Sequence, residues 1–198
     1  MTGPINQNGR PGPDIGASRR PALMPSLPGI LLLPALLLLV GCRASLPPLE
    51  PVDYVDLERF MGDWYVIANI PTFLEKEAYN AVESYRLAED GTIPTTFTFN
   101  KGGFDGPLKE YHPRGFVRDT ESNAVWGMQF IWPIKADYRI IHLTDDYSVT
   151  VIGHNPRNYV WLMARTPTLS AERYQEALQV IAEAGYDLSE LRKVPQRW

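Results

Sequence analysis

Apolar and polar residues alternate along most of the chain from residue 64 onward, with the period of a strand that buries one face. Phe97 and Phe99 alternate with threonine and asparagine, and Val149 and Val151 alternate with serine and threonine. Short polar or glycine-containing connectors separate most of these runs, as is typical of hairpins. The pattern predicts eight strands, over residues 64–70, 81–88, 92–100, 109–118, 124–132, 138–143, 148–153 and 159–165.

Two segments follow a helical period instead. Residues 170–185 begin with Ser170, a favoured N-cap residue, and end at Gly185, a favoured C-terminal residue. Their apolar residues form one stripe, made of Tyr174, Ala177, Leu178 and Ile181. Residues 56–61 are expected to form a short turn with its apolar side chains on one side, namely Leu57, Phe60 and Met61.

Eight consecutive strands with short connectors favour an antiparallel barrel, because closure removes both exposed sheet edges. The predicted fold class is all-β: an eight-stranded antiparallel up-and-down β-barrel with a short N-terminal 3-10 turn and a C-terminal α-helix packed on the barrel. Such a barrel leaves room for about one small ligand. The connector over residues 71–80 is long and mixes apolar with charged residues, so we expect it to be a lid at the mouth.

Residues 1–41 have the pattern of a signal peptide rather than of a folded segment. Arg19 and Arg20 precede an apolar run over residues 27–40, which Pro34 interrupts. This run is shorter than the roughly 20 residues that a membrane-spanning helix needs. We therefore predict export of the chain and removal of residues 1–41.

The apolar run ends in Leu39-Val40-Gly41-Cys42, which resembles the lipobox of bacterial lipoproteins, and Cys42 is the only cysteine. We expect Cys42 to carry the lipid anchor, residues 42–52 to form a lipidated proline-rich tether, and residues 53–198 to form the domain. Arg43 follows the cysteine, where an aspartate would signal retention at the inner membrane. The predicted location is the outer membrane, on its periplasmic side.

Charge and composition argue against several other functions. The formal net charge of −4 makes nucleic acid an unfavourable partner. The three histidines, His112, His142 and His154, lie in different segments without metal-ligand spacing, so no metal or cofactor is expected. No catalytic grouping stands out, and the chain is predicted not to be an enzyme. The alternative is an acid–base pair of Glu83 and His142.

The first strand begins with Gly62 and Trp64, and one face of that indole needs a cover. In a closed eight-strand meander the end of the last strand lies beside the start of the first, which brings Arg165 to Trp64. A guanidinium over an indole contributes about 1–2 kcal/mol when partly desolvated. We therefore expect Gly62, Trp64 and Arg165 to form the floor of the barrel.

Three motifs resemble those of the lipocalin family, and of its bacterial lipoproteins in particular. They are Gly62-Asp63-Trp64-Tyr65, the turn Thr144-Asp145-Asp146-Tyr147, and Trp161-Leu162-Met163-Ala164-Arg165-Thr166-Pro167. The resemblance implies a carrier of apolar ligands, with fatty acids or lysophospholipids as ligands and envelope maintenance as the role. The resemblance also allows the protein to form a homodimer.

Residues that would face the interior are candidates for contact with ligand, namely Val66, Ala68, Tyr85, Phe97, Phe99, Met128, Phe130 and Tyr138. Glu83 is in register with Tyr85, so its carboxylate is expected in or near the cavity, or at a mouth position in water. Two other functions stay open. One is a structural or partner-binding lipoprotein with a filled barrel, and the other is an isomerase-type lipocalin enzyme.

Overall fold

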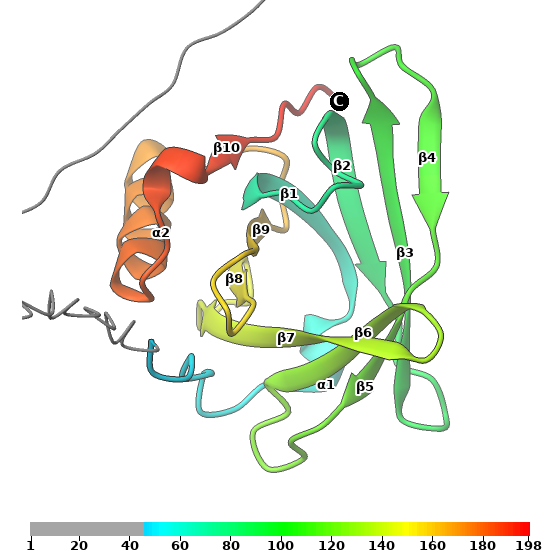
Figure 1. Ribbon diagram of the computed structural model, residues 1–198, viewed down its shortest axis with the longest axis vertical. Coiled ribbons are helices and arrows are strands. Elements are labelled where there is room, and N and C mark those ends of the chain that lie inside the picture. The colour runs from blue at the N-terminus through cyan, green and yellow to red at the C-terminus, as the bar shows by residue number, and fades with distance from the viewer. Residues whose placement is uncertain (1–45) are drawn as a thin grey trace, which may run out of the picture. The chain divides into compact units, whose positions relative to one another are not determined.

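The structure, a computed structural model, describes residues 46–198, in which an antiparallel sheet closes into a barrel (Figure 1). The predicted signal peptide and Cys42 lie outside the described residues. From β1 to β9 consecutive strands pair with each other, except that β4 and β5 both pair with β3, and β1 also pairs with β9, which closes the ring. The strands are β1 (Gly62–Ile70), β2 (Ala78–Tyr85), β3 (Thr92–Lys101), β4 (Leu108–Tyr111), β5 (Arg114–Val117), β6 (Val125–Ile131), β7 (Ile134–Leu143), β8 (Val149–Gly153) and β9 (Val160–Ala164).

The predicted strand over residues 109–118 is divided into β4 and β5. Both segments pair with β3 in one continuous register, since Phe97 pairs with Tyr111 and Pro94 with Arg114. Pro113 lies at the break, where it has no N–H to donate to a ladder. Counted as one interrupted strand, β4 and β5 complete the eight-stranded up-and-down barrel that the sequence predicts.

The helices differ from the prediction in one detail. The turn before β1 is a single α-helical turn, α1 (Leu57–Phe60), rather than a 3-10 turn. The carboxylate of Asp56 accepts the N–H of Arg59 at 3.2 Å and so caps this turn. The C-terminal helix α2 (Ala171–Glu183) forms as predicted, and Ser170 accepts the N–H of Arg173 at 3.3 Å.

Helix α2 covers the outer wall of the barrel (Figure 1). Ala177 and Ile181 are buried there against a second apolar cluster that includes Val151 and Leu162. A helix with one apolar stripe must bury that stripe, and the outward-facing apolar residues of β1, β8 and β9 provide the surface. The barrel therefore has an inner core and a separate core beneath the helix.

The C-terminal segment fills a gap in the barrel wall. The sequence predicted neither the gap nor this segment's role. A 3-10 turn, η1 (Leu188–Glu190), leads into β10 (Arg192–Lys193), which pairs with β1 at Ala68 and Asn69. Strands β1 and β2 pair only over the first four residues of β1. Beyond that point, the side-chain amide of Gln196 donates to the carbonyls of Val66 and Ala81 at 2.8 and 3.1 Å. The C-terminal segment thus joins two strands that have separated.

Trp64 and Arg165 close the floor of the barrel. The guanidinium carbon of Arg165 lies 3.9 Å from the centroid of the buried indole, whose N–H donates to the carbonyl of Phe60 at 2.9 Å. Arg165 also donates to four carbonyls, those of Asp63 and Arg59 at 2.8 Å, that of Phe60 at 3.0 Å and that of Tyr147 at 3.4 Å. Gly62 has φ of 94°, and a Cβ there would lie 3.4 Å from Nη1 of Arg165.

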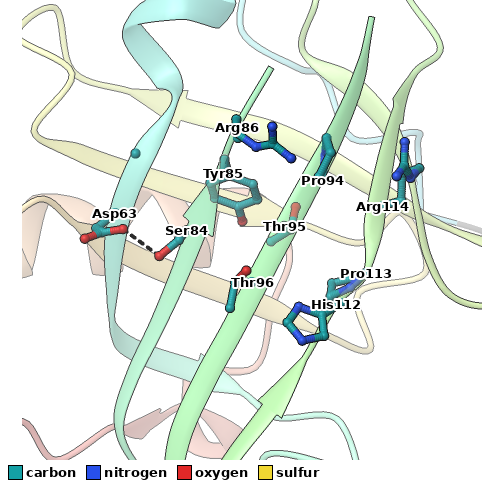
Figure 2. A pocket seen from close by; sticks show the side chains of 11 residues that line it. Asp63, Ser84, Tyr85, Arg86, Pro94, Thr95, Thr96, His112, Pro113 and Arg114 are labelled. Atoms are coloured by element: carbon teal, nitrogen blue, oxygen red, sulfur yellow. Dashed lines mark hydrogen bonds between the residues drawn. The ribbon is translucent and has the colours of Figure 1, made fainter. Parts of the chain in front are cut away.

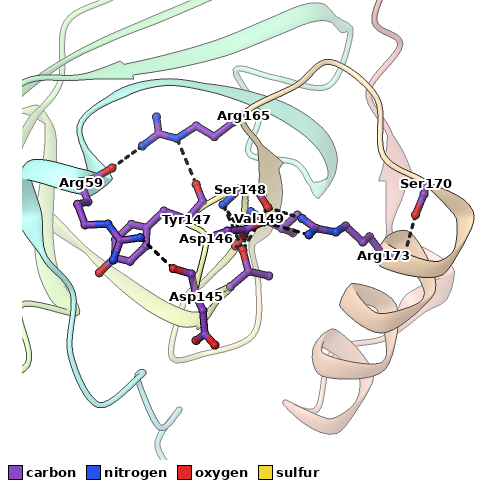
Figure 3. A network of polar contacts seen from close by, with 10 residues as sticks. Arg59, Asp145, Asp146, Tyr147, Ser148, Val149, Arg165, Ser170 and Arg173 are labelled. Atoms are coloured by element: carbon purple, nitrogen blue, oxygen red, sulfur yellow. Dashed lines mark hydrogen bonds and ion pairs between the residues drawn. The ribbon is translucent and has the colours of Figure 1, made fainter.

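The turn between β7 and β8 supports the same end of the barrel (Figure 3). The hydroxyl oxygen of Thr144 accepts the backbone N–H groups of Ser148 and Val149 at 3.1 and 3.0 Å. The guanidinium of Arg59 lies 3.9 Å above the ring of Tyr147, whose hydroxyl accepts the N–H of Asp56 at 2.8 Å. The turn, α1 and Arg165 are therefore joined into one polar network beneath the barrel.

We expect Arg165→Ala to lower the free energy of unfolding by roughly 1–3 kcal/mol, because it removes the stacking on Trp64 and the hydrogen bonds to four backbone carbonyls. Arg173→Ala is the matched control. Arg173 forms an exposed ion pair with Asp146 at 3.0 Å, and such pairs contribute little. Urea unfolding of both variants checks this, and equal effects would contradict the clamp at the floor.

Candidate ligand-binding site

A cavity of about 200 Å³ lies at the end of the barrel opposite the floor. Strand β1 starts at the floor with Gly62, and the connector after its far end supplies Thr72 and Glu75 to the cavity wall. Most of the other wall residues are apolar or aromatic, among them Phe73, Leu74, Phe97, Met128, Phe130, Ile131, Tyr138, Tyr159 and Trp161. The arrangement suits an apolar ligand, because burial of apolar surface is favourable.

An aromatic column fills the barrel between the floor and this cavity. The ring of Phe60 lies 5.0 Å from Trp64 and 5.4 Å from Trp126, which stacks on Tyr138 at 5.1 Å with an interplanar angle of 7°. Tyr138 is also part of the cavity wall. The lower half of the barrel is therefore packed, and the hollow part begins at Tyr138.

The structure places the eight predicted ligand contacts in three different environments. Four of them line the cavity, namely Phe97, Met128, Phe130 and Tyr138. Val66, Tyr85 and Phe99 are buried in the inner core and are not part of the cavity wall. Phe99 packs against Tyr111 there, with ring centroids 6.1 Å apart.

The eighth candidate, Ala68, does not face the interior, and this part of the prediction needs correction. The β1–β9 ladder shifts register between Val66 and Ala68, which marks a β-bulge. Because side chains alternate between faces, one extra residue turns all later positions to the other side. Ala68 is consequently buried in the cluster beneath α2, together with Ala177 and Ile181.

Glu83 lies at the boundary between the packed and the hollow half. The hydroxyl of Tyr85 donates to Oε2 of Glu83, and the hydroxyls of Tyr85 and Tyr138 lie 2.7 Å apart. The side chain is enclosed by protein, yet it keeps some surface toward the cavity that it lines. The expectation that this carboxylate lies in the cavity is therefore correct.

Burial raises the pKa of Glu83 to about 7. The hydrogen bond from Tyr85 opposes this increase, and the charge of Glu75 adds to it. Burial also holds the pKa values of Tyr85 and Tyr138 well above their usual range, with a further contribution from the charge of Glu83. Both phenols are thus neutral hydrogen-bond donors beside a carboxyl group that titrates near neutrality.

A second carboxylate, Glu75, organises the mouth of the cavity. Its Oε2 accepts from the side chains of Asn69 and Trp161, both at 2.8 Å, and its Oε1 accepts from Thr72 at 2.7 Å. These bonds attach the connector over residues 71–80, which we expected to be a lid, to both β1 and β9. Nothing in the sequence indicated this role, because Trp161 is 86 residues away from Glu75.

The structure does not bring His142 to Glu83, the acid–base pair that was the alternative to a binding protein. His142 is near Glu176 of α2, and partial burial lowers its pKa, so it lies on the helix side and does not pair with Glu83. His112 forms an exposed pair with Glu110 at 3.0 Å. His154 lines the cavity, and its Nδ1 is buried without a hydrogen-bond partner in residues 46–198. Burial lowers the pKa of His154, so a neutral ring faces the cavity.

A second hollow, of about 410 Å³, lies on the outside of β2 and β3 (Figure 2). Polar and charged side chains form most of its wall, including Ser84, Thr96, Arg86 and Arg114. The hydroxyl of Ser84 donates to Asp63 at 2.5 Å across it. This exposed groove offers little apolar surface, and the interior cavity is therefore the better candidate for an apolar ligand.

Comparison with known proteins agrees with this architecture. A family model described as "Lipocalin-like domain" matches residues 55–196, and the chain belongs to the lipocalin family. It is 32% identical to temperature-induced lipocalin-1 of Arabidopsis thaliana over 160 residues, 75% of this chain and 83% of the relative. It is 29% identical to outer membrane lipoprotein Blc of Escherichia coli over 174 residues, 86% of this chain and 97% of the relative.

The fold has counterparts among solved structures. Insecticyanin from the tobacco hornworm Manduca sexta aligns with a TM-score of 0.60 at 15% identity, over 75% of this chain and 84% of that chain. Apocrustacyanin C2 aligns with a TM-score of 0.58 at 13% identity, over 72% and 80%. Within residues 46–198, no helix has both the length and the apolar character needed to cross a membrane.

We expect Glu83→Gln to stabilise the protein at alkaline pH and to have a smaller effect in acid. The pKa of Glu83 in the folded protein, about 7, exceeds its ordinary value of 4.5, so its contribution to stability is fully present below about pH 4.5 and is lost as the pH rises through 7. The glutamine variant lacks this loss, which amounts to at most about 3 kcal/mol. Unfolding free energies measured across this range for the native protein, Glu83→Gln and the exposed control Glu190→Gln check the sign. A Glu83→Gln effect that is independent of pH would contradict it.

Proposed function

We propose that this protein binds lipids with a single acyl chain and carries them at a bacterial outer membrane. The observation that supports this proposal is the apolar cavity above a closed floor, with Phe97, Met128, Phe130 and Tyr138 in its wall. An acyl chain gains about 0.8 kcal/mol for each methylene that it buries in such a space. Membership of the lipocalin family supports a small hydrophobic ligand of this kind.

The size of the cavity favours one chain. At about 200 Å³ it lies below the 300–1,000 Å³ that is typical of sites for larger organic ligands. A fatty acid or a lysophospholipid has one chain, whereas a membrane phospholipid has two. The remainder of a long chain would lie along the rim of the mouth.

The rim is unusually apolar for an exposed surface. Phe73 is 76% exposed and Trp132 82% exposed, and their neighbours at the β6–β7 hairpin, Phe130, Ile131 and Ile134, are also exposed. Phe73, Phe130 and Ile131 belong to the cavity wall as well. This continuous apolar path would allow a chain to pass between a lipid surface and the cavity with little contact with water.

The lipid anchor belongs to the same proposal. Cys42 follows the lipobox-like Leu39-Val40-Gly41, and one relative bears the name outer membrane lipoprotein. We propose that acyl chains on Cys42 hold the protein at the periplasmic side of the outer membrane, where several chains give firm anchoring. A role in envelope maintenance would follow from lipid transport at that place.

The two alternative functions have weaker support. The aromatic column from Trp64 to Tyr138 fills the lower half of the barrel, which favours a structural protein, but the hollow above it argues for binding. An isomerase-type lipocalin would use a cysteine in the barrel, and residues 53–198 contain none. His142 lies on the helix side, so the pair with Glu83 is absent, and the lipocalin family consists generally of binders that are not enzymes.

The binding proposal predicts that the delipidated protein binds single-chain lipids with one site per protein molecule. Ala136 is exposed at the rim of the cavity, so Ala136→Phe should narrow the cavity with little loss of stability and weaken binding by at least about tenfold. Ala182→Phe, at an exposed position of α2, is the matched control. Tryptophan fluorescence titration measures the affinities. If the native protein binds no single-chain lipid, the barrel is structural.

The anchor proposal predicts that cells grown with labelled palmitate incorporate the label into the native chain and not into Cys42→Ser. Arg43→Ala, beside the lipidated position, should retain the label. Gel autoradiography of the purified proteins provides the measurement. Label in the Cys42→Ser chain would show that the acyl chains are attached elsewhere.

A further inference from the structure

The charged groups around the cavity all have the same sign. Glu75, Glu83 and Asp137 line it, and within residues 46–198 no lysine or arginine belongs to its wall. The remaining titratable wall residues are His154 and the phenols Tyr138 and Tyr159. An acyl chain could enter this cavity at no electrostatic cost, but a negatively charged head group could not.

Two of the three carboxylates are already satisfied. Glu75 accepts three hydrogen bonds, from Asn69, Thr72 and Trp161. Asp137 pairs with Arg139 at 3.1 Å and accepts the backbone N–H of Asn155 at 2.9 Å. Glu83 differs, since Tyr85 donates to Oε2 only, and Oε1 has no donor in the described part of the chain. Oε1 is not among the fully buried atoms without a partner, so it is accessible from the cavity and can accept a hydrogen bond from a group bound there.

We propose that Glu83 supplies the head-group contact of the ligand, and that the ligand is a single-chain lipid whose polar end donates a hydrogen bond and carries no negative charge. This inference rests on the proposed function of the cavity. A hydroxyl group, as in a fatty alcohol or a monoacylglycerol, or an ammonium group would satisfy Oε1. The chain would then extend from Glu83 along Phe97 and Met128 toward the rim.

The same geometry disfavours a fatty acid that enters head first. A carboxylate beside Glu83 would face a second negative charge in an enclosed site, where solvent screens little. No cation of the wall could compensate for it, because His154 is neutral and Tyr85 and Tyr138 are phenols. The protein would therefore distinguish lipids of equal chain length by the charge of their head group.

The protonation state of Glu83 distinguishes the two possible ligand donors, a hydroxyl group and an ammonium group. Its pKa of about 7 is set by burial, by Tyr85 and by Glu75, while Asp137, Tyr138, His154 and Tyr159 are the other titratable groups of the wall. Below that pH the carboxyl is neutral and can bind a hydroxyl, and above it the carboxylate attracts an ammonium. Affinity for an amine should therefore rise with pH, whereas affinity for an alcohol should change little.

The test compares dodecanol, dodecylamine and dodecanoate, which share one chain length, on the delipidated mature chain carrying Cys42→Ser. At about pH 8 we expect dodecanoate to bind at least about tenfold more weakly than dodecanol. Glu83→Gln should reduce that difference several-fold and weaken dodecylamine, whereas the surface control Glu190→Gln should change neither. Titration calorimetry at about pH 6 and about pH 8 gives the affinities.

Each outcome has one meaning. Tighter binding of either the alcohol or the amine, lost in Glu83→Gln, supports the proposal and identifies the donor. Dodecanoate that binds as well as dodecanol at about pH 8, or a Glu83→Gln effect equal for all three ligands, overturns it and means that the head group stays outside. Failure of all three ligands to bind overturns the function of the cavity itself.

Discussion

The stacking of Arg165 on Trp64 is the contact on which the rest of the structure depends. It joins the first and last strands of the barrel at one end, and its hydrogen bonds also hold α1. With this end closed, the aromatic column above it can pack without solvent, and the free space is confined to the opposite end. The position of the cavity is thus a consequence of how the floor is built.

The boundary between the two halves is chemically distinct from both. The packed half presents aromatic rings and the hollow half an apolar wall, while Tyr85, Glu83 and Tyr138 place three oxygen-bearing side chains between them. A buried carboxyl lowers the stability of a barrel when it ionises. A ligand that donates a hydrogen bond to Glu83 would offset this cost. The same carboxyl would make binding selective for the charge of the ligand's head group.

The sequence predicted those features that repeat or follow from chain topology. Alternation predicted the eight strands, and closure of a meander predicted that Arg165 lies beside Trp64, as the structure shows. Local irregularities were not predictable in this way. The bulge between Val66 and Ala68 turned Ala68 and the positions after it to the opposite face of β1, and Pro113 divided a strand. The two-residue strand β10 is too short for a period, and Glu75 binds Trp161, which is 86 residues away, so neither feature left a signal in the sequence.

The central claim is that an acyl chain occupies the hollow half and stops at the aromatic column. Methionine methyl groups report on this directly, because Met128 lines the cavity, Met163 is buried in the inner core and Met61 lies at the floor. Nuclear Overhauser contacts between an acyl chain and methionine methyls labelled with carbon-13 measure the position of the chain. The account predicts contacts to Met128 and none to Met61. Contacts to Met61, or saturating lipid without any contact to Met128, would contradict it.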